Sequence, residues 1–363
     1  MHSDSLPVTL QATLIQRHKK YGRGIWLAVG LGLLLVAIGL QAGSFAQSSN
    51  DMWQMLLKIF TSENLTQQQT IHWYIFSELR APRMVMAIFV GALLAMSGCA
   101  MQGLVRNPLA DPGLIGISAG AAAAAATTLA LINHYPELEL AGQYLIAASA
   151  FVGALLAVWV VLLVAKTPMG TAISSLILAG VAVNALAGTH IGAISYLAND
   201  DALRQITYWT MGSLGGINWQ KVLFVGALGV PAIGVFLHLR KALNMLALGE
   251  NEAQCMGLAV TKYKRLTLWL VAFSVALATA LCGIIGFIGL VVPHIARSLF
   301  GADHRYLMPA CGVLGAVLML LADIISRALF PPLEIPIGIV TSAVGAPFFL
   351  YLLAKGKGQS SYV

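Results

Sequence analysis

Residues 84–104 read MVMAIFVGALLAMSGCAMQGL, a run of 21 residues without a charged side chain. A helix needs about 20 apolar residues to cross the hydrocarbon core of a bilayer, so this run predicts one crossing. The rest of the chain has the same character: of 363 residues, 58% are hydrophobic and only 10% are charged, whereas soluble domains carry about 25% charged residues. The sequence therefore predicts an all-α, polytopic membrane protein.

The composition also excludes several classes of protein. The net charge of +7 does not indicate a nucleic-acid binder, because the basic residues are scattered between apolar blocks instead of being gathered on one face. The four cysteines, Cys99, Cys255, Cys282 and Cys311, have no CxxC spacing and predict neither a disulfide framework nor a metal site. No HExxH or phosphate-loop motif is present. If this protein moves a solute uphill, the nucleotide hydrolysis that drives it must therefore come from a partner.

Ten stretches are predicted to be membrane spans. The eighth is the shortest, and it contains Pro293 and His294. The first follows a basic segment, so a cleaved signal peptide is the alternative, but both the basic segment and the apolar run are longer than signal peptides usually have. The predicted spans are 25–44, 84–104, 113–132, 143–165, 171–196, 220–239, 262–286, 288–300, 306–328 and 336–354.

The distribution of Lys and Arg predicts the orientation. With the N-terminus in the cytoplasm, 15 of the 21 basic residues fall in cytoplasmic segments, as the positive-inside rule requires. Both termini are then cytoplasmic, with a tail over 1–24, one membrane domain over 25–355 and a second tail over 356–363. Without the eighth span, Lys355 and Lys357 would lie outside, so the charge bias favours keeping it.

A weak internal repeat is also predicted. The string GLVRNP begins at Gly103, and the similar string GLVVP begins at Gly289. Two copies that are five helices apart must have opposite orientations, an arrangement found in transporters. A chance match of two short apolar strings is the alternative.

Ionisable residues inside predicted spans are functional hypotheses. His190 in the fifth span faces a pathway or is a hydrogen-bonded packing residue, and the sequence leaves both interpretations open. Asp323 and Arg327 are four residues apart, so on a helix they share a face and are expected to pair. No chain of buried acids of the kind that proton-coupled carriers use is evident.

The segment over 240–258 belongs to the longest internal segment that is predicted to be cytoplasmic. Its apolar residues follow helical spacing, and Gly249 and Gly257 stand where two short helices would end. Such a helix–Gly–helix element either fits a groove on another protein or lies along the bilayer surface.

Several motifs together resemble the FecCD family, the permease subunits of ABC importers for iron-siderophores, haem and cobalamin. The resemblance extends from about residue 25 to residue 355. It rests on LRAPR from Leu79, GALLAMSG from Gly91, MQGLVRNPLADPGLIG from Met101, ALGE from Ala247, GFIGLVVPH from Gly286, EIPIG from Glu334 and GAP from Gly345.

The resemblance implies a type II importer permease fold with ten helices, a homodimer with its pathway on the two-fold axis, and a bacterial inner-membrane location. It implies two cytoplasmic ATPase subunits that bind ATP and magnesium, and one periplasmic binding protein. This chain itself would be no enzyme and would bind no cofactor or metal. Lipid surrounds it, and nucleic acid is not a partner.

The resemblance also implies roles for particular residues. The residues that would dock the binding protein are Arg80, Arg83 and Arg327. The coupling helices over about 242–258 would seat on the ATPase through Leu243, Leu246, Leu248, Gly249, Glu250, Ala253, Met256 and Gly257. A cytoplasmic gate would be formed by Asn107, Pro108, Leu109, Thr171, Ser174 and Ser175, with His190 beside the pathway.

The segment over 199–216 is similar to the corresponding stretch of haem permeases. The expected function is therefore import of haem or another iron chelate from periplasm to cytoplasm. An iron-siderophore or cobalamin permease of the same family is the alternative. The alternatives from other classes are an ion-coupled secondary carrier, which would work without an ATPase, and a membrane-embedded enzyme, which needs clustered ionisable residues.

Overall fold

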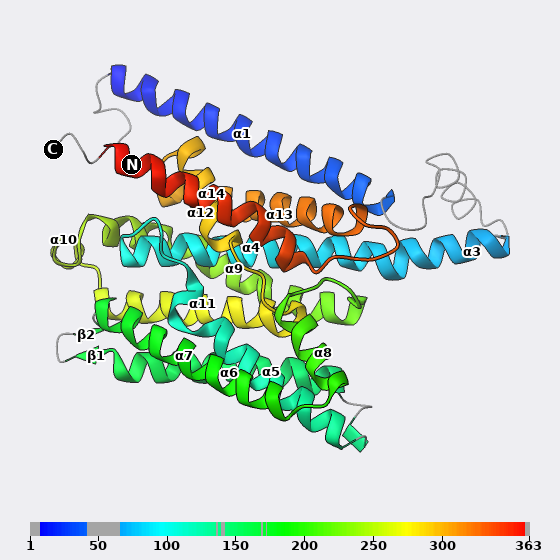
Figure 1. The fold of residues 1–363 in the computed structure, drawn as a ribbon. Helices are drawn as coiled ribbons and strands as arrows, with labels where there is room; N and C mark the ends of the chain where they lie inside the picture. The colour runs from blue at the N-terminus through cyan, green and yellow to red at the C-terminus, as the bar shows by residue number, and fades with distance from the viewer. Residues whose placement is uncertain are drawn as a thin grey trace.

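The computed structural model describes the backbone of residues 8–41, 66–135, 137–138, 142–167, 170–171 and 173–359. Helices that run roughly along one direction make up nearly all of this part of the chain (Figure 1). They are α1 (Val8–Gln41), α3 (Gln67–Tyr74), α4 (Ala81–Val105), α5 (Ile117–His134), α6 (Gly142–Val164), α7 (Ile173–Leu197), α8 (Asp200–Thr210), α9 (Trp219–Leu248), α10 (Glu250–Cys255), α11 (Val260–Cys282), α12 (Ile288–Phe300), α13 (His304–Ala328) and α14 (Ile337–Gln359).

The predicted all-α membrane fold is confirmed. Within the described residues, eight helices are long and apolar enough to cross a bilayer, and 288–300 and 337–352 form two shorter apolar helices. The described residues also contain a hairpin of two very short strands, β1 (Lys166–Thr167) and β2 (Gly170–Thr171), in which Lys166 pairs with Thr171.

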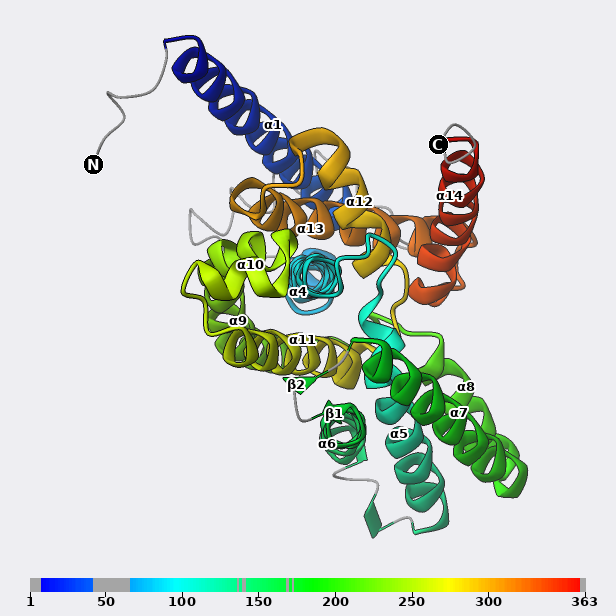
Figure 2. The same ribbon diagram turned by 90° about the vertical axis from the view of Figure 1, so that its left-hand side faces the viewer.

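Helix α4 is the centre of the bundle. Viewed along its axis it is enclosed by α9, α11, α12 and α13 (Figure 2). Glycines make this enclosure possible: a Cβ atom at Gly91 would overlap the carbonyl group of Gly315 on α13, and one at Gly98 would overlap that of Gly289 on α12. In lipid, small residues let helix backbones approach closely where no hydrophobic force drives association.

The eighth predicted span forms the short helix α12, which covers only part of a crossing. Helix α12 has 13 residues, which at 1.5 Å per residue is about 20 Å against a core of about 30 Å. Helix α11 ends at Cys282, four residues before the predicted limit, because Gly283 turns the chain out of the helix with φ 70°. The segment over 283–287 packs against the end of α8, where the Ser213 N–H donates to the Cys282 carbonyl at 2.7 Å. Non-helical backbone is tolerated at membrane depth where other parts of the protein cover it, as they do here.

Other helix boundaries differ from the predicted spans where the flanking sequence is more polar. Helix α1 begins at Val8 instead of 25. Helix α4 continues a helical segment that starts with α3 and passes through a π-helical turn, η1 (Ile75–Arg80). Helix α8 was not predicted, although Asn199 caps it by accepting from the Ala202 N–H, and two aspartates follow in its first turn. The two repeat strings differ in structure, since the first runs past the end of α4 and the second lies inside α12; the inverted repeat stays a prediction.

Candidate functional site

A charged cluster lies at the end of the bundle where α4 begins and α13 ends. Asp323 is fully buried, and its two carboxylate oxygens accept from the Arg83 Nε at 2.6 Å and an Arg327 Nη at 2.9 Å. Arg83 also donates to Glu334 at 2.7 Å, and the Glu334 side chain is 47% exposed. The expected pairing of Asp323 with Arg327 is confirmed, and Arg83 joins it from another helix.

The same cluster holds the end of α1. Arg80 donates to the carbonyls of Leu40 at 2.8 Å and Gln41 at 3.2 Å, and Arg327 donates to the carbonyl of Gly39 at 3.0 Å. The last carbonyls of a helix have no partner within the helix, and cations are stabilising near that end. The arginines therefore attach α1 to the rest of the bundle.

The structure buries all three arginines to which the docking role was assigned. Arg80, Arg83 and Arg327 are each at most 8% exposed. Their partners lie far away along the chain, so the sequence alone does not indicate this burial. The docking role assigned to them is untested and stays a prediction.

The predicted coupling segment lies at the opposite end of the bundle (Figure 1). The first of its two expected short helices is the last part of the 30-residue α9. Gly249, with φ 143°, separates α9 from α10, and Gly257, with φ 84°, follows α10. The break between α9 and α10 therefore falls at the glycine that the sequence indicated.

Only part of this segment is available to a partner. Leu248 and Met256 are exposed, as is Gly257, whereas Leu243, Leu246 and Ala253 are buried and anchor the segment to the bundle. Glu250 binds Lys264 at 2.7 Å and so fixes α10 against α11. An exposed apolar pair on a rigidly held turn is suited to a protein contact.

A polar cluster that the sequence analysis missed lies beside the coupling segment. Asn244 of α9 donates to Asp303 at 2.6 Å, and its carbonyl oxygen accepts from the backbone N–H of His304 at 2.8 Å. The His304 ring packs on Gly103 of α4, where a Cβ atom would lie 2.6 Å from Nε2. A single polar residue on a helix produces no periodic pattern in the sequence. The sequence therefore could not predict this cluster, and only the fold shows that α4, α9 and α13 meet here.

Asp303 caps α13 through the N–H of Arg305 at 2.9 Å. Partial burial would raise the pKa of its carboxyl group, but hydrogen bonds from Arg305 and Asn244 and the charge of Arg305 outweigh that effect and lower the pKa. An aspartate whose pKa is lower in the folded state stabilises above its unfolded value of about 3.9, and this contribution is lost as the pH falls through the folded value.

We therefore expect Asp303→Asn to melt below the wild type at pH 7 in detergent, because the charge-assisted hydrogen bonds are lost. The difference between the two melting temperatures should shrink as the pH falls below about 4. Thermal unfolding of both proteins over pH 3–7 measures this. A difference that stays constant with pH would contradict the role given to the Asp303 charge.

The predicted gate residues form two separate groups. Asn107, Pro108 and Leu109 are exposed in the loop after α4, where the Asn107 side chain accepts from the Leu109 N–H at 2.9 Å. Ser174 and Ser175 lie in the first turn of α7 and not in a loop, because the β1–β2 hairpin precedes them. Thr171 belongs to β2, and its side chain lies outside the described part. The structure records no hydrogen bond between the two described groups, and the gate stays a prediction.

His190 lies on an exposed face of α7, and its Nε2 is 2.7 Å from the Thr127 hydroxyl of α5. This contact supports the packing interpretation without removing the residue from a possible pathway face. Among the described residues, no three His, Cys, Asp or Glu side chains come together as a metal site.

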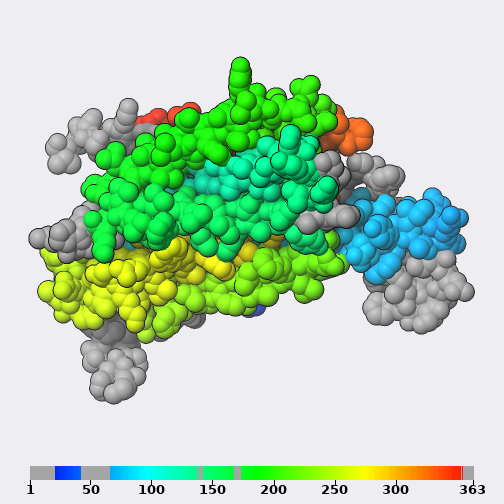
Figure 3. Space-filling view, turned by 90° about the horizontal axis from the view of Figure 1, so that it is seen from below, coloured from blue at the N-terminus to red at the C-terminus, as the bar shows by residue number. Residues whose placement is uncertain are grey.

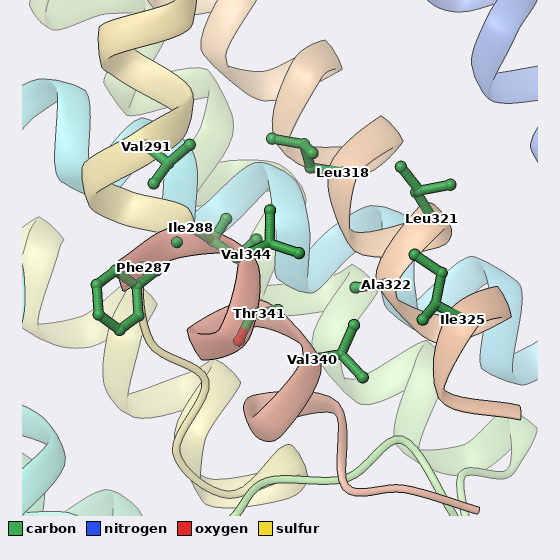
Figure 4. Close-up of a pocket in the computed structure, with 11 residues that line it drawn as sticks. Phe287, Ile288, Val291, Leu318, Leu321, Ala322, Ile325, Val340, Thr341 and Val344 are labelled. Carbon is green, nitrogen blue, oxygen red and sulfur yellow. The ribbon is translucent and has the colours of Figure 1, made fainter. Parts of the chain in front are cut away.

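A small apolar cavity of about 60 Å³ lies between α12, α13 and α14, and Figure 4 shows Phe287, Thr341 and Val344 along it. Ligand pockets usually have about 300–1,000 Å³. Phe287 has φ 66°, and its ring leaves no room for a side chain at Gly345. The cavity is therefore a packing gap beside α14 and too small for a substrate of drug size.

The comparisons with known proteins agree with this architecture. A model of the FecCD transport family matches residues 31–355. The hemin transport system permease protein HmuU of Yersinia pestis is 39% identical over 91% of this chain and 97% of that protein. The vitamin B12 import system permease protein BtuC of Salmonella typhi is also 39% identical, over 77% of this chain and 83% of that protein.

A solved structure supports the same conclusion. A metal-chelate type ABC transporter in an inward-facing conformation has a TM-score of 0.78 and 30% identity, covering 92% of this chain and 99% of that one. The family consists of permease subunits, which are not themselves enzymes and which work with ATPase and binding-protein partners. The apolar helices of the described residues, the glycine-packed α4 and these matches over most of the chain agree, and the chain is an ABC importer permease that belongs to the FecCD transport family.

Proposed function

We propose that this permease carries haem, or another iron chelate, from the periplasm to the cytoplasm across a bacterial inner membrane. The observation that supports this most is the similarity to the hemin permease, which extends over 97% of that protein. The cobalamin permease is equally identical over a smaller share of both chains and supports the second candidate, cobalamin.

The proposal includes a homodimer, two ATPase subunits, one periplasmic binding protein and cytoplasmic termini. The ATPases would bind ATP and magnesium. ATP binding would close them and push on the turn that carries Leu248 and Met256, which are exposed at 67% and 48%. The Glu250–Lys264 pair and buried Ala253 would transmit this movement to α11.

We also propose that the binding protein docks at Arg80, Arg83 and Arg327, but only after one of the existing contacts of Arg83 has been broken. Asp323 and Glu334 already occupy two N–H groups of Arg83. A carboxylate of the binding protein would therefore have to displace Glu334, the half-exposed partner, before it binds Arg83.

The coupling role predicts that Leu248→Ser together with Met256→Ser abolishes stable co-purification of the ATPase. Removing two apolar contacts at the centre of an interface costs about 1–2 kcal/mol each, or more than tenfold in affinity together. Leu333→Ser is the matched control, since Leu333 is 74% exposed in the loop before α14. Equal ATPase recovery from the double variant and the control would contradict the assignment.

The transport assignment is tested with the complete assembly in vesicles. ATP hydrolysis and uptake are measured with binding protein that is loaded with haem, with cobalamin or with nothing. Stimulation by the haem-loaded protein supports the proposal, and stimulation by the cobalamin-loaded protein alone selects the second candidate. Uptake that persists without any ATPase would show a secondary carrier instead.

A further inference from the structure

A wide groove lies on the side of the bundle where α6, α9 and α11 meet. Its volume is about 440 Å³, within the range of ligand-binding sites. Ala147 and Phe151 of α6, Phe224 and Leu228 of α9, and Leu277 of α11 line it. The ring of Phe151, which lines the groove, meets the Phe273 ring edge to face, with the ring centres 5.7 Å apart. The groove is therefore an apolar slot that is open along one side and ends inside the membrane region.

Polar residues gather at one end of this slot. Gln143 and Tyr144 begin α6, Gln220 and Lys221 begin α9, and the Tyr144 hydroxyl lies 3.3 Å from the Gln220 side-chain oxygen. Lys221 is the one charged residue among the described residues that line the groove. Its ammonium group donates to the Gly216 carbonyl at 3.0 Å, and an ammonium group has three donors. The rim thus offers a positive charge and hydrogen-bond donors where the slot opens.

The length of the slot matches one leaflet of a bilayer. From Tyr144 to Val152, and equally from Gln220 to Leu228, is eight residues, or about 12 Å at the helical rise. Half of the hydrocarbon core is about 15 Å. A lipid whose headgroup contacts Lys221 would therefore extend its acyl chain to the Phe151–Phe273 pair.

The groove opens on the outer surface of the chain. Figure 3 shows α6, α9 and α11 reaching this surface together.

We propose that the α6–α9–α11 groove binds a phospholipid with an anionic headgroup, with the acyl chain in the slot and the phosphate at Lys221. An anionic headgroup is selected because the lysine charge has no acidic partner among the described lining residues. By the orientation predicted from the basic residues, this lipid belongs to the outer leaflet. The site is independent of which substrate the transporter carries.

The experiment uses the full chain, purified in a mild detergent and mixed with phosphatidylglycerol and phosphatidylcholine that have the same acyl chains. Native mass spectrometry counts the lipids that stay bound and their ratio. Lys221→Gln removes the charge, and Ala148→Phe fills the slot. Lys262→Gln and Ala182→Phe are the matched controls, because both residues are exposed and lie outside the groove.

The wild type and both controls are expected to retain phosphatidylglycerol in preference to phosphatidylcholine. Lys221→Gln should lower that preference by about fivefold, and Ala148→Phe should lose one bound lipid of either kind. A preference that is unchanged in Lys221→Gln, or a lipid count that is unchanged in Ala148→Phe, would overturn the proposal. Disulfide-linked dimers of Ala147→Cys would also overturn it, because they would show that a second copy of the chain occupies the groove.

Discussion

Replacement of Asp323 by alanine is expected to lower the free energy of unfolding by about 3–5 kcal/mol, the usual cost of removing one partner of a buried ion pair. The reason is that Asp323 is fully buried and its single carboxylate pairs with two guanidinium groups, those of Arg83 and Arg327. Without it, the two buried positive charges would lie together beside the half-exposed Glu334. Thermal or denaturant unfolding of the purified permease in detergent measures the loss.

Glu334→Gln is the matched control for this change. Glu334 also pairs with Arg83, but its side chain is 47% exposed, and half-exposed ion pairs contribute little, about 0–1 kcal/mol. Equal destabilisation by the two changes would show that burial does not set the strength of this cluster. A stable Asp323→Ala protein would contradict its role in attaching α1, α4 and α13 to one another.

Gly98→Ala is expected to be the other strongly destabilising change. A Cβ atom at this position would overlap the Gly289 carbonyl, which belongs to backbone and cannot turn aside as a flexible side chain would. Helices α4 and α12 would have to separate, at a cost of about 1–3 kcal/mol or more. The melting temperature of the purified protein should fall accordingly.

Gly234→Ala on α9 is the control, because nothing lies within 4 Å of a Cβ atom there. The same chemical change should then be neutral or slightly stabilising, since alanine favours the helix by about 1 kcal/mol over glycine. If Gly98→Ala proved as harmless as Gly234→Ala, the close approach of α4 and α12 would be refuted.

Much of the fold was predictable because a membrane span is a local property. Hydropathy over about 20 residues locates a helix without any knowledge of its neighbours, so the predicted run over 143–165 became Gly142–Val164 and that over 171–196 became Ile173–Leu197. The turn at Gly249 was predictable for a related reason, since glycine at a helix end signals a stop on its own.

The site was predictable only where one segment carries it. The predicted coupling segment is one stretch of chain, and the sequence indicated its break at Gly249 but did not separate exposed Leu248 from buried Leu243. The polar contact between Asn244 and Asp303 joins residues 59 apart, and no local pattern indicates it. The α6–α9–α11 groove likewise forms between three helices that are distant along the chain.

By itself the sequence determined the approximate positions of the apolar helices, because charge scarcity and hydropathy are set within each segment. Only the tertiary structure decided the environment of the arginines. Arg83 meets Asp323 across 240 residues, and this contact buries a charge whose partner no local pattern indicates. The tertiary structure likewise decided how α12 begins, because non-helical chain around Gly283 and Phe287 precedes it.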